Sequence, residues 1–491
     1  MSSEFFDVVI VGAGLSGIGA ACHLQKECPG KSYVILESRE TMGGTWDLFR
    51  YPGIRSDSDM HTLGYNFKPW KESKAIADGP AILKYIKETA AEHDIDRHIR
   101  YGQRVLRASW STADAGWEIE MQQAGSTGSR FIRCNMLLMC SGYYNYEHGY
   151  LPEFAGRERF QGVIIHPQDW PEDLDYSGKR VVVIGSGATA MTLIPEMAKD
   201  VEQIVMLQRS PTYVISFPDE DVIANVLRAI LPEKWAYAIT RWKNIKFQQW
   251  TYRQTRIRPE TVRRILLRRV RKELGDDYDV EKHFTPRYDP WDQRMCLVPN
   301  SDLFEAIRSG KASIVTDTID TFTERGILLD SGNELQADII VTATGLDLIV
   351  LGGVEFDVDG KPVDFSQTMT YKGLMTSGVP NLVSTFGYIN ASWTLRADLV
   401  AEWFCQLVNH MDSAGVCQVT PTPGPGDEPV SPYIMGFSSG YIQRVLDRLP
   451  KQSDRAPWSN PQDYRQDRKM FENARFDDGA LVFSGEIRRC A

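Results

Sequence analysis

Two stretches of the chain repeat one order of apolar and polar positions. Residues 7–11 (DVVIV) form a continuous apolar run, which predicts a buried parallel strand. A glycine-rich turn follows at residues 12–17, then a helical stretch at 18–25 and a second strand at 32–36, which ends at Glu37. The order of strand, glycine turn, helix, strand and acid is the context that a dinucleotide-binding fingerprint requires.

The residues of this first turn have separate predicted tasks. Gly12 permits the tight turn, Gly14 lets the backbone approach a pyrophosphate, and Gly17 lets the helix pack on the strand. The phosphates are expected at the helix N-terminus, where free N–H groups and the helix dipole favour anions. Glu37 is placed to accept a hydrogen bond from a ribose hydroxyl.

The second unit differs in one chemical respect. Residues 179–184 predict a strand, followed by the turn GSGATA at 185–190, a helix at 191–197 and a strand at 203–207. The acid of the first unit is absent here, and Arg209 lies near the end of the strand. An arginine accommodates a 2′-phosphate that an acid would repel, so this unit predicts NADP rather than NAD. Two such units together indicate a flavoprotein that binds two dinucleotides.

Two further apolar runs end in small residues. Residues 136–140 lead to Ser141-Gly142, and residues 338–342 lead to Ala343-Thr344-Gly345. Each run read alone is consistent with an ordinary core strand and turn. Beside the two glycine turns, they are better explained as crossings between two domains, where small residues let the chain pass close to a cofactor.

The predicted fold class is therefore α/β, with two Rossmann-like dinucleotide-binding domains and a helical insertion. We expect the first part of an FAD domain at residues 1–175 and an NADP domain at 176–345, with the insertion at about 217–285 inside it. Residues 346–491 are expected to return to the FAD domain and to add a C-terminal segment.

Composition and net charge exclude several classes of protein. The 491 residues are 24% charged and 42% hydrophobic, as in ordinary globular proteins, and the net charge of −10 argues against a nucleic-acid binder. No stretch reaches the ~20 apolar residues of a membrane-spanning helix, and no secretion signal is predicted at the start. The eight cysteines show no zinc or haem spacing, no metal site is predicted, and Cys134 and Cys140 are interpreted as core residues. A reducing cytoplasm fits this pattern.

One segment departs from the acidic average. Residues 228–273 carry 14 Lys/Arg and only 3 Asp/Glu, with Trp, Tyr, Leu and Ile between the charges. One interpretation is a solvated helical face whose arginines cover apolar surface with their stems. The other is peripheral contact with an acidic membrane surface.

The chemistry is indicated by two motifs outside the glycine turns. Disulfide reduction would need a C-x-x-C or C-x₄-C pair beside the flavin, and the sequence has neither. Residues 160–171 (FQGVIIHPQDWP) fit F-x-G-x-x-x-H-x-x-x-W-P, and residues 43–57 fit G-G-x-W-x₄-Y-P-G-x₃-D. In both motifs the chain resembles the type I Baeyer–Villiger monooxygenases. Segments such as TWDLFRYPGIRSDSD and PWDQR are most similar to the ethionamide-activating monooxygenase branch.

The resemblance implies a reaction and its cofactors. NADPH reduces FAD, O₂ forms a C4a-peroxyflavin, and one oxygen atom is inserted next to a ketone carbonyl to give an ester or lactone. The same intermediate can oxygenate sulfides and thioamides. The alternative is an N/S-oxygenating flavin-containing monooxygenase, whose linker motif usually ends in Tyr or Phe where this chain has Trp170.

The resemblance also implies the site residues. Arg294 aligns with the family's catalytic arginine, and Asp57 with the carboxylate that orients it. A minority interpretation makes His166 an acid or base, but in this family it lies in a linker that couples domain movement. The expected cofactor-binding residues are Gly12, Gly14, Ser16, Gly17, Glu37, Thr45, Trp46, Asp47, Leu48, Arg55, Ser56, Asp57, Val105, Gly185, Ser186, Gly187, Ala188, Thr189, Ala190, Arg209 and Ser210.

Two smaller points concern cofactor binding. Some relatives carry Lys before the catalytic arginine, where this chain has Gln293, so Arg209 and Ser210 are left to recognise NADPH. Residues 390–393 (NASW) precede a helical stretch, whose N-terminus either stabilises negative charge on reduced flavin or is a simple helix cap.

Overall fold

The apolar runs form two separate sheets in the computed structural model, which describes residues 4–472 and 474–486. The first sheet is nine-stranded, in the order β18-β17-β4-β5-β6-β1-β2-β3, and β21 pairs with β6 outside this path. Its strands are β1 Glu4–Val11, β2 Tyr33–Leu36, β3 Ile99–Arg100, β4 Gln103–Ser111, β5 Gly116–Gln123, β6 Ser129–Met139, β17 Glu355–Val358, β18 Lys361–Pro362 and β21 Leu382–Ser384. The pairs β1–β2, β1–β6 and β6–β21 are parallel, as the continuous apolar runs predict.

The second sheet has five parallel strands in the order β12-β9-β8-β16-β7. They are β7 Val163–Ile165, β8 Arg180–Ile184, β9 Gln203–Gln208, β12 Ala312–Thr316 and β16 Ile339–Val341. The expected α/β class with two Rossmann-like units is confirmed. The predicted boundary at residue 175 lies too late for this sheet, because β7 already pairs with β16. Three apolar residues are too short a run to identify a strand from sequence alone.

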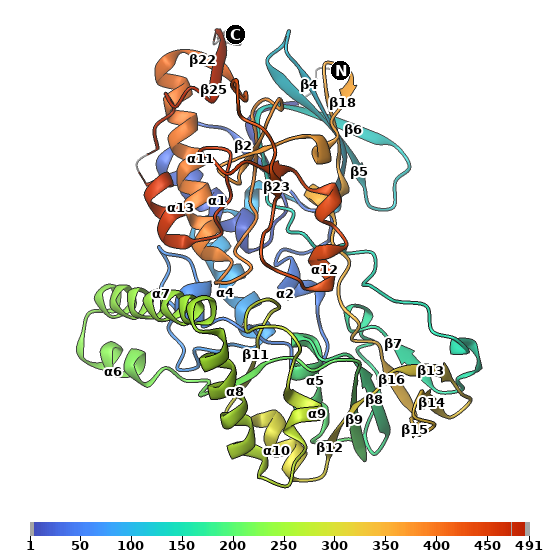
Figure 1. Ribbon diagram of the computed structural model, residues 1–491. Coiled ribbons are helices and arrows are strands. Elements are labelled where there is room, and N and C mark those ends of the chain that lie inside the picture. The colour runs from blue at the N-terminus through green and yellow to red at the C-terminus, as the bar shows by residue number, and fades with distance from the viewer. Residues whose placement is uncertain (1–3, 473, 487–491) are drawn as a thin grey trace.

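Helices pack against both sheets (Figure 1). The described helices are α1 Leu15–Glu27, α2 Thr45–Leu48, α3 Met60–Leu63, α4 Gly79–Glu92, α5 Ala188–Met197, α6 Val222–Ile230, α7 Glu233–Ile257, α8 Pro259–Leu274, α9 Val280–Phe284, α10 Asp302–Arg308, α11 Thr394–Ala414, α12 Gly440–Gln443 and α13 Tyr464–Phe471. Each glycine turn leads into a helix, α1 or α5. Helices α6 to α9 occupy the segment predicted as a helical insertion.

Short sheets complete the fold. They are β10 Val214–Phe217 with β11 Cys296–Pro299, β13 Ile319–Phe322 with β14 Gly326–Leu329 and β15 Glu334–Gln336, β19 Thr370–Tyr371 with β20 Met375–Thr376, β22 Val416–Pro421 with β25 Leu481–Glu486, and β23 Ser431–Pro432 with β24 Lys451–Gln452. The antiparallel pair β22–β25 lies at the top of Figure 1, beside α11. No helix in the described part of the chain is both long enough and apolar enough to cross a bilayer.

The apolar interior follows this division. One core contains the α1 face of the first sheet together with α11, whose Trp403 and Phe404 are fully buried. A second core surrounds α5 and contains β8, β9, β16 and α10. Cys134 and Cys140 are buried, as expected of small core residues, and Cys490 lies outside the described residues.

Candidate active site

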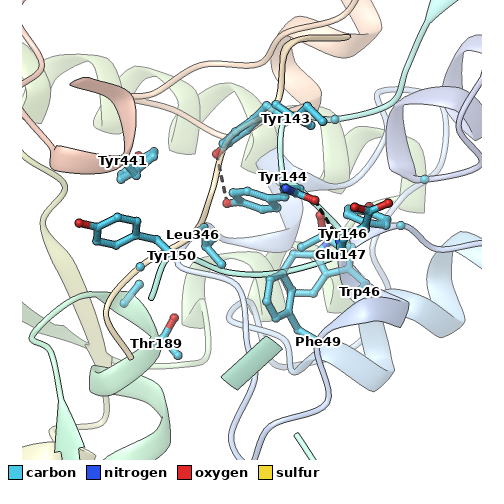
Figure 2. A pocket seen from close by; sticks show the side chains of 18 of the residues that line it. Trp46, Phe49, Tyr143, Tyr144, Tyr146, Glu147, Tyr150, Thr189, Leu346 and Tyr441 are labelled. Atoms are coloured by element: carbon cyan, nitrogen blue, oxygen red, sulfur yellow. Dashed lines mark hydrogen bonds between the residues drawn. The ribbon is translucent and has the colours of Figure 1, made fainter. Parts of the chain in front are cut away.

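A large cavity of about 1360 Å³ lies between the two sheets. Both glycine turns line it, as do the ends of β6 and β16 and residues of the C-terminal segment. Figure 2 shows side chains on its wall, among them Trp46, Tyr143 and Thr189. Such a position, outside the carboxyl ends of parallel strands, is where open α/β sheets bind their ligands.

The first glycine turn has the shape expected of a dinucleotide cradle. Gly12 has φ +103°, and a Cβ there would lie 2.6 Å from the Cys140 carbonyl oxygen. A Cβ on Gly17 would lie 1.9 Å from the Gly12 carbonyl oxygen, so both positions require glycine. Gly14 is different, because its nearest neighbour is the Gly44 Cα at 3.5 Å and it borders the cavity. The open side of Gly14 fits the close approach of a pyrophosphate.

The second turn repeats this geometry. Gly185 has φ +133°, and a Cβ there would lie 2.2 Å from the Ala343 carbonyl oxygen. At Gly187 a Cβ would meet no atom within 4 Å, and the residue borders the cavity. On the protein side, Cys140 after β6 closes the first turn and Ala343 after β16 closes the second. Both turns are open toward the cavity. The residues present therefore fit two dinucleotides.

The acid at the end of β2 is held in place by the backbone. Glu37 accepts hydrogen bonds from the Ala13 N–H at 2.8 Å and the Arg39 N–H at 2.9 Å. Burial raises the pKa of Glu37, and these backbone donors oppose that effect. Arg39, which the sequence did not single out, also lines the cavity.

Not all of the expected cofactor residues reach the cavity. Asp47 is buried against Arg39, with 2.5 Å between its Oδ2 and the arginine Nη2. Leu48 packs against the second core. The expected residues that line the cavity are Gly12, Gly14, Ser16, Glu37, Thr45, Trp46, Arg55, Ser56, Asp57, Val105, Gly185, Ser186, Gly187, Ala188, Thr189, Arg209 and Ser210, whereas Gly17, Asp47, Leu48 and Ala190 do not.

Arg55 lines the cavity and also contacts the second unit. Its Nη1 lies 2.7 Å from Oδ2 of Asp302 in α10, and its Nη2 donates to the Met191 carbonyl oxygen at 3.4 Å. Both partners belong to the second unit. Arg55 therefore joins the two units at the edge of the cavity.

Arg294 and Asp57 meet across the cavity, although 237 positions separate them in the sequence. The Arg294 Nε donates to Asp57 Oδ2 at 2.7 Å. The Asp57 carboxylate raises the pKa of Arg294 above its ordinary value, although burial works against the cation. The guanidinium is thus a permanent charge, held in one orientation by one carboxylate.

Tyrosines that sequence reasoning missed line the same cavity. Tyr143, Tyr144 and Tyr146 follow β6, and Tyr441 comes from α12 (Figure 2). The Tyr143 and Tyr144 hydroxyls lie 3.2 Å apart, and burial raises the pKa of Tyr143 and of Tyr441. Residues 143–146 (YYNY) directly follow a predicted crossing, which is a signal that could have identified three of them. No local signal points to Tyr441.

Residues 390–393 precede α11, as expected. Trp393 occupies the N-cap position, and its side chain makes no cap hydrogen bond to the helix. Its indole N–H donates instead to Ser16 Oγ at 2.7 Å, in the first glycine turn. The ring also stacks on Tyr143 with centroids 5.1 Å apart. This contact connects the α11 N-terminus to the predicted flavin site.

His166 lies between β7 and β8, two strands of the second sheet, so it follows the crossing from the first sheet. Its Nδ1 accepts from the Gln168 N–H at 3.2 Å, so its Nε2 carries the proton and donates to the Gly345 carbonyl oxygen at 3.2 Å. Burial lowers the pKa of His166, which favours this neutral form. Neither His166 nor Trp170 lines the cavity. The linker role of both residues stays a prediction, and their position outside the cavity agrees with it.

Two dinucleotide-binding units around one cavity define a flavoprotein oxidoreductase. The model of the family described as flavin-binding monooxygenase-like matches residues 6–351. The chain is 54% identical to FAD-containing monooxygenase EthA of Mycobacterium tuberculosis over 98% of both chains. It is 49% identical to the probable FAD-binding monooxygenase AlmA of Acinetobacter baylyi, over 98% of this chain and 96% of that protein.

Solved structures of the same fold extend over the whole chain. A steroid monooxygenase bound to NADP superposes with a TM-score of 0.77 at 24% identity, covering 98% of this chain and 99% of that one. Cyclohexanone monooxygenase from Rhodococcus sp. Phi1 bound to NADP⁺ gives 0.76 at 19% identity, covering 99% and 100%. The chain belongs to the flavin-binding monooxygenase-like family. It is a flavoprotein monooxygenase whose cofactors are FAD and NADPH, and its resemblance to the Baeyer–Villiger enzymes is confirmed.

Proposed function

We propose that this monooxygenase converts a ketone, O₂, NADPH and a proton into an ester or lactone, NADP⁺ and water. The observation that carries the proposal is the Arg294–Asp57 pair inside a cavity bordered by both glycine turns. The structural relatives named for cyclohexanone and steroid oxygenation support the reaction class. Sulfides and thioamides are proposed as secondary substrates, because the same oxidising group can attack sulfur.

The cofactors are proposed to occupy the two halves of the cavity. Gly12, Gly14 and Glu37 would hold FAD, and Gly187 and Arg209 would hold NADPH, with the phosphates at the N-termini of α1 and α5. Bound and reduced FAD supplies the electrons that activate O₂.

Arg294 is proposed as the catalytic residue. A permanent cation favours the negative charge that develops on oxygen during attack and rearrangement. Asp57 orients the guanidinium through its Nε, which leaves both terminal amino groups available to donate. An arginine can do this without exchanging a proton, because its pKa lies far above the working pH.

The test is product analysis with a long-chain ketone. Protein reduced by NADPH without oxygen is mixed with air and 2-dodecanone, and the products are identified by mass spectrometry. We expect an ester that is one oxygen atom heavier than the ketone. Peroxide release with no ester, together with turnover of sulfides or amines, would favour the N/S-oxygenating alternative.

A variant separates the role of Arg294 from cofactor binding. Arg294→Ala should bind FAD and be reduced by NADPH, yet ester formation should fall by about 100- to 1000-fold, because only charge stabilisation is lost. Flavin absorbance and the reduction rate provide the control. An unchanged ester yield would contradict the assigned role.

The location is proposed as cytoplasmic with peripheral membrane contact. The basic segment at residues 228–273, with 14 Lys/Arg against 3 Asp/Glu, supports this contact in a chain of net charge −10. Anionic lipid headgroups attract such a segment. No other part of the chain departs so far from the acidic average.

A further inference from the structure

An exposed apolar face covers α6 and α7, at the left of Figure 1. Of the 18 exposed large hydrophobic side chains among the described residues, ten lie on these two helices. We call them the outward face: Val222, Ile223, Val226 and Ile230 of α6, and Trp235, Ile239, Trp242, Phe247, Trp250 and Ile257 of α7. A patch of this kind marks an interaction site on a protein surface.

Helix α7 exposes its apolar side and buries much of its polar side, the reverse of an ordinary surface helix. At roughly 100° per residue, its exposed Trp235, Ile239, Trp242, Trp250 and Ile257 fall within an arc of about 80°. The opposite side faces the protein, and much of it is polar. Its buried or half-buried polar residues are Thr240, Arg241, Asn244, Gln248 and Thr255. A surface helix usually places these two sides the other way round.

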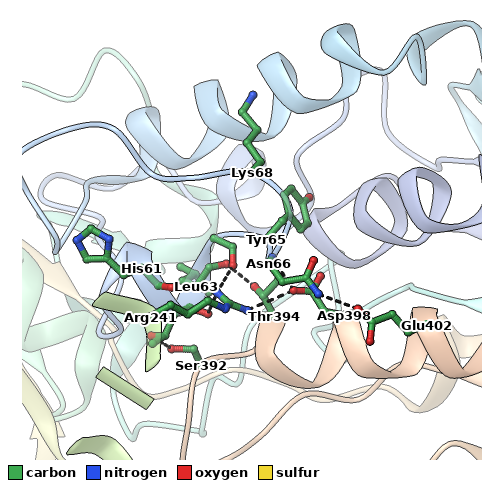
Figure 3. Close-up of polar contacts among 12 residues, drawn as sticks. His61, Leu63, Tyr65, Asn66, Lys68, Arg241, Ser392, Thr394, Asp398 and Glu402 are labelled. Atoms are coloured by element: carbon green, nitrogen blue, oxygen red, sulfur yellow. Dashed lines mark hydrogen bonds and ion pairs between the residues drawn. The ribbon is translucent and has the colours of Figure 1, made fainter. Parts of the chain in front are cut away.

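Polar contacts fix this orientation. The Arg241 Nη1 donates to the carbonyl oxygens of His61 at 2.9 Å and Gly64 at 2.7 Å, at the end of α3. Its Nη2 lies 3.3 Å from Asp398 Oδ2 in α11 (Figure 3). Asn244 and Gln248 each donate to Asp59 at 2.9 Å. The helix cannot roll its apolar side inward without breaking these bonds, so the tryptophans stay exposed.

The charges on the outward face indicate the partner. Lys246 and Arg253 lie within the same arc as the tryptophans, and both are exposed. The nearby acids are engaged, because Asp221 pairs with Lys243 at 2.7 Å and Glu233 with Lys71 at 3.2 Å. A second copy that met this face with its own outward face would bring two basic segments together and be repelled. An anionic lipid surface matches both the charge and the apolar side chains.

We propose that the outward face of α6 and α7 docks on an anionic lipid bilayer, with its tryptophans buried at the headgroup level. Tryptophan is enriched at this level, where its ring meets acyl chains and its N–H meets water. The helices lie in the plane of the interface and do not span it, because no described helix is suited to crossing. The inference rests on the proposed membrane contact and is independent of the ketone chemistry.

The experiment measures binding of the purified holoenzyme to vesicles. Phosphatidylcholine vesicles are compared with vesicles of equal parts phosphatidylcholine and phosphatidylglycerol, by flotation at low and high salt. We expect wild-type protein to bind the anionic vesicles, with part of the binding retained at high salt and tryptophan fluorescence shifted to the blue. The retained part reports apolar insertion, because salt screens only the charges.

Two variants separate apolar insertion from charge. The triple change Trp235→Ser, Trp242→Ser and Trp250→Ser should lower the partition coefficient by about 100-fold or more and abolish the salt-resistant part. The double change Lys246→Gln and Arg253→Gln should lower binding by about fivefold per residue, and only on anionic vesicles. Phe131→Ser is the matched control, because Phe131 is 47% exposed and belongs to β6 of the first sheet, outside the outward face.

The outcomes distinguish apolar insertion of the outward face from the electrostatic contact of the basic segment. If the triple variant binds like wild type and high salt releases both fully, the outward face does not insert, and only the electrostatic contact stands. If wild type binds no vesicles, both the apolar insertion and the electrostatic contact are refuted. In that case, a dimer that light scattering detects for wild type and not for the triple variant would assign the outward face to a second copy of the chain. Ester formation from a water-soluble ketone should be unchanged in all variants, which excludes misfolding as the cause of lost binding.

Discussion

Single residues in the cavity carry separate parts of the proposed reaction. Arg294 is positioned by Asp57 alone among its described hydrogen-bond partners, and Arg209 lies exposed at the end of β9. The two arginines therefore differ in purpose. Arg294 is held by a carboxylate inside the cavity, whereas Arg209 is exposed and is proposed to bind the 2′-phosphate of NADPH.

Replacing Arg209 tests the choice of nicotinamide cofactor. Arg209→Ala should raise the KM for NADPH by about 10- to 100-fold and leave the KM for NADH nearly unchanged, because a charge-assisted bond to the 2′-phosphate is lost. Steady-state kinetics with both cofactors measures this. Arg325→Ala, an exposed arginine of the same unit outside the cavity, serves as the control. Equal effects on both cofactors would refute the assignment.

At the scale of elements, two linkers join the sheets and touch one another. His166, just after β7, donates to the Gly345 carbonyl oxygen beyond β16. Gly149 lies against the same imidazole, and a Cβ there would lie 1.9 Å from its Cε1. The His166 imidazole thus packs against both linkers, which also share backbone hydrogen bonds such as that from the Tyr150 N–H to the Gly345 carbonyl oxygen at 3.0 Å.

Gly149→Ala should therefore disturb both linkers. The ring must move and lose its bond to Gly345, at a cost of about 1–3 kcal/mol of stability, as for other overpacked sites. Thermal unfolding measures the loss, and Gly30→Ala is the control, because no atom lies within 4 Å of its Cβ position. Adding His166→Ser to Gly149→Ala removes the clash and should recover part of the stability. If Gly149→Ala alone were as stable as wild type, the linkers would not be tightly packed at this point.

At the scale of the molecule, the helical insertion links the two units. Helix α8 packs beside α9 and α10 in the second unit, whereas α7 reaches α3 and α11 in the first. Among the described residues of the insertion, Arg241 is the most buried charged residue, at 8% exposure. The insertion is therefore part of the scaffold around the cavity as well as a surface.

Removing this anchor should release α7. Arg241→Met loses the bonds to the α3 carbonyls and leaves Asp398 without its arginine, which should cost about 3–5 kcal/mol. We expect a lower thermal midpoint and faster proteolysis within residues 222–284. The exposed Arg253→Met should change stability by no more than about 0.5 kcal/mol. Equal behaviour of the two variants would mean that Arg241 does not anchor the helix.

The sequence by itself determined the two dinucleotide units, the glycines of their turns and the class of chemistry. These depend on local order, since an apolar run, a glycine turn and a helix signal can be read within about 30 residues. The pairing of Arg294 with Asp57 followed from motif resemblance, and the structure brings the two side chains together. Their roles stay predictions to be measured.

Only the tertiary structure decided contacts between distant segments. Three such contacts share no local sequence pattern. Tyr441 of α12 reaches the cavity, Arg55 pairs with Asp302, and Trp393 donates a hydrogen bond to Ser16. The direction in which α7 faces was also undetermined, because its sequence carries apolar and polar stripes and either could face inward. In the structure the polar stripe faces inward, because it supplies hydrogen-bond donors to the α3 carbonyl oxygens and to Asp398. Leaving these buried acceptors without donors would cost more free energy than exposing the tryptophans to solvent.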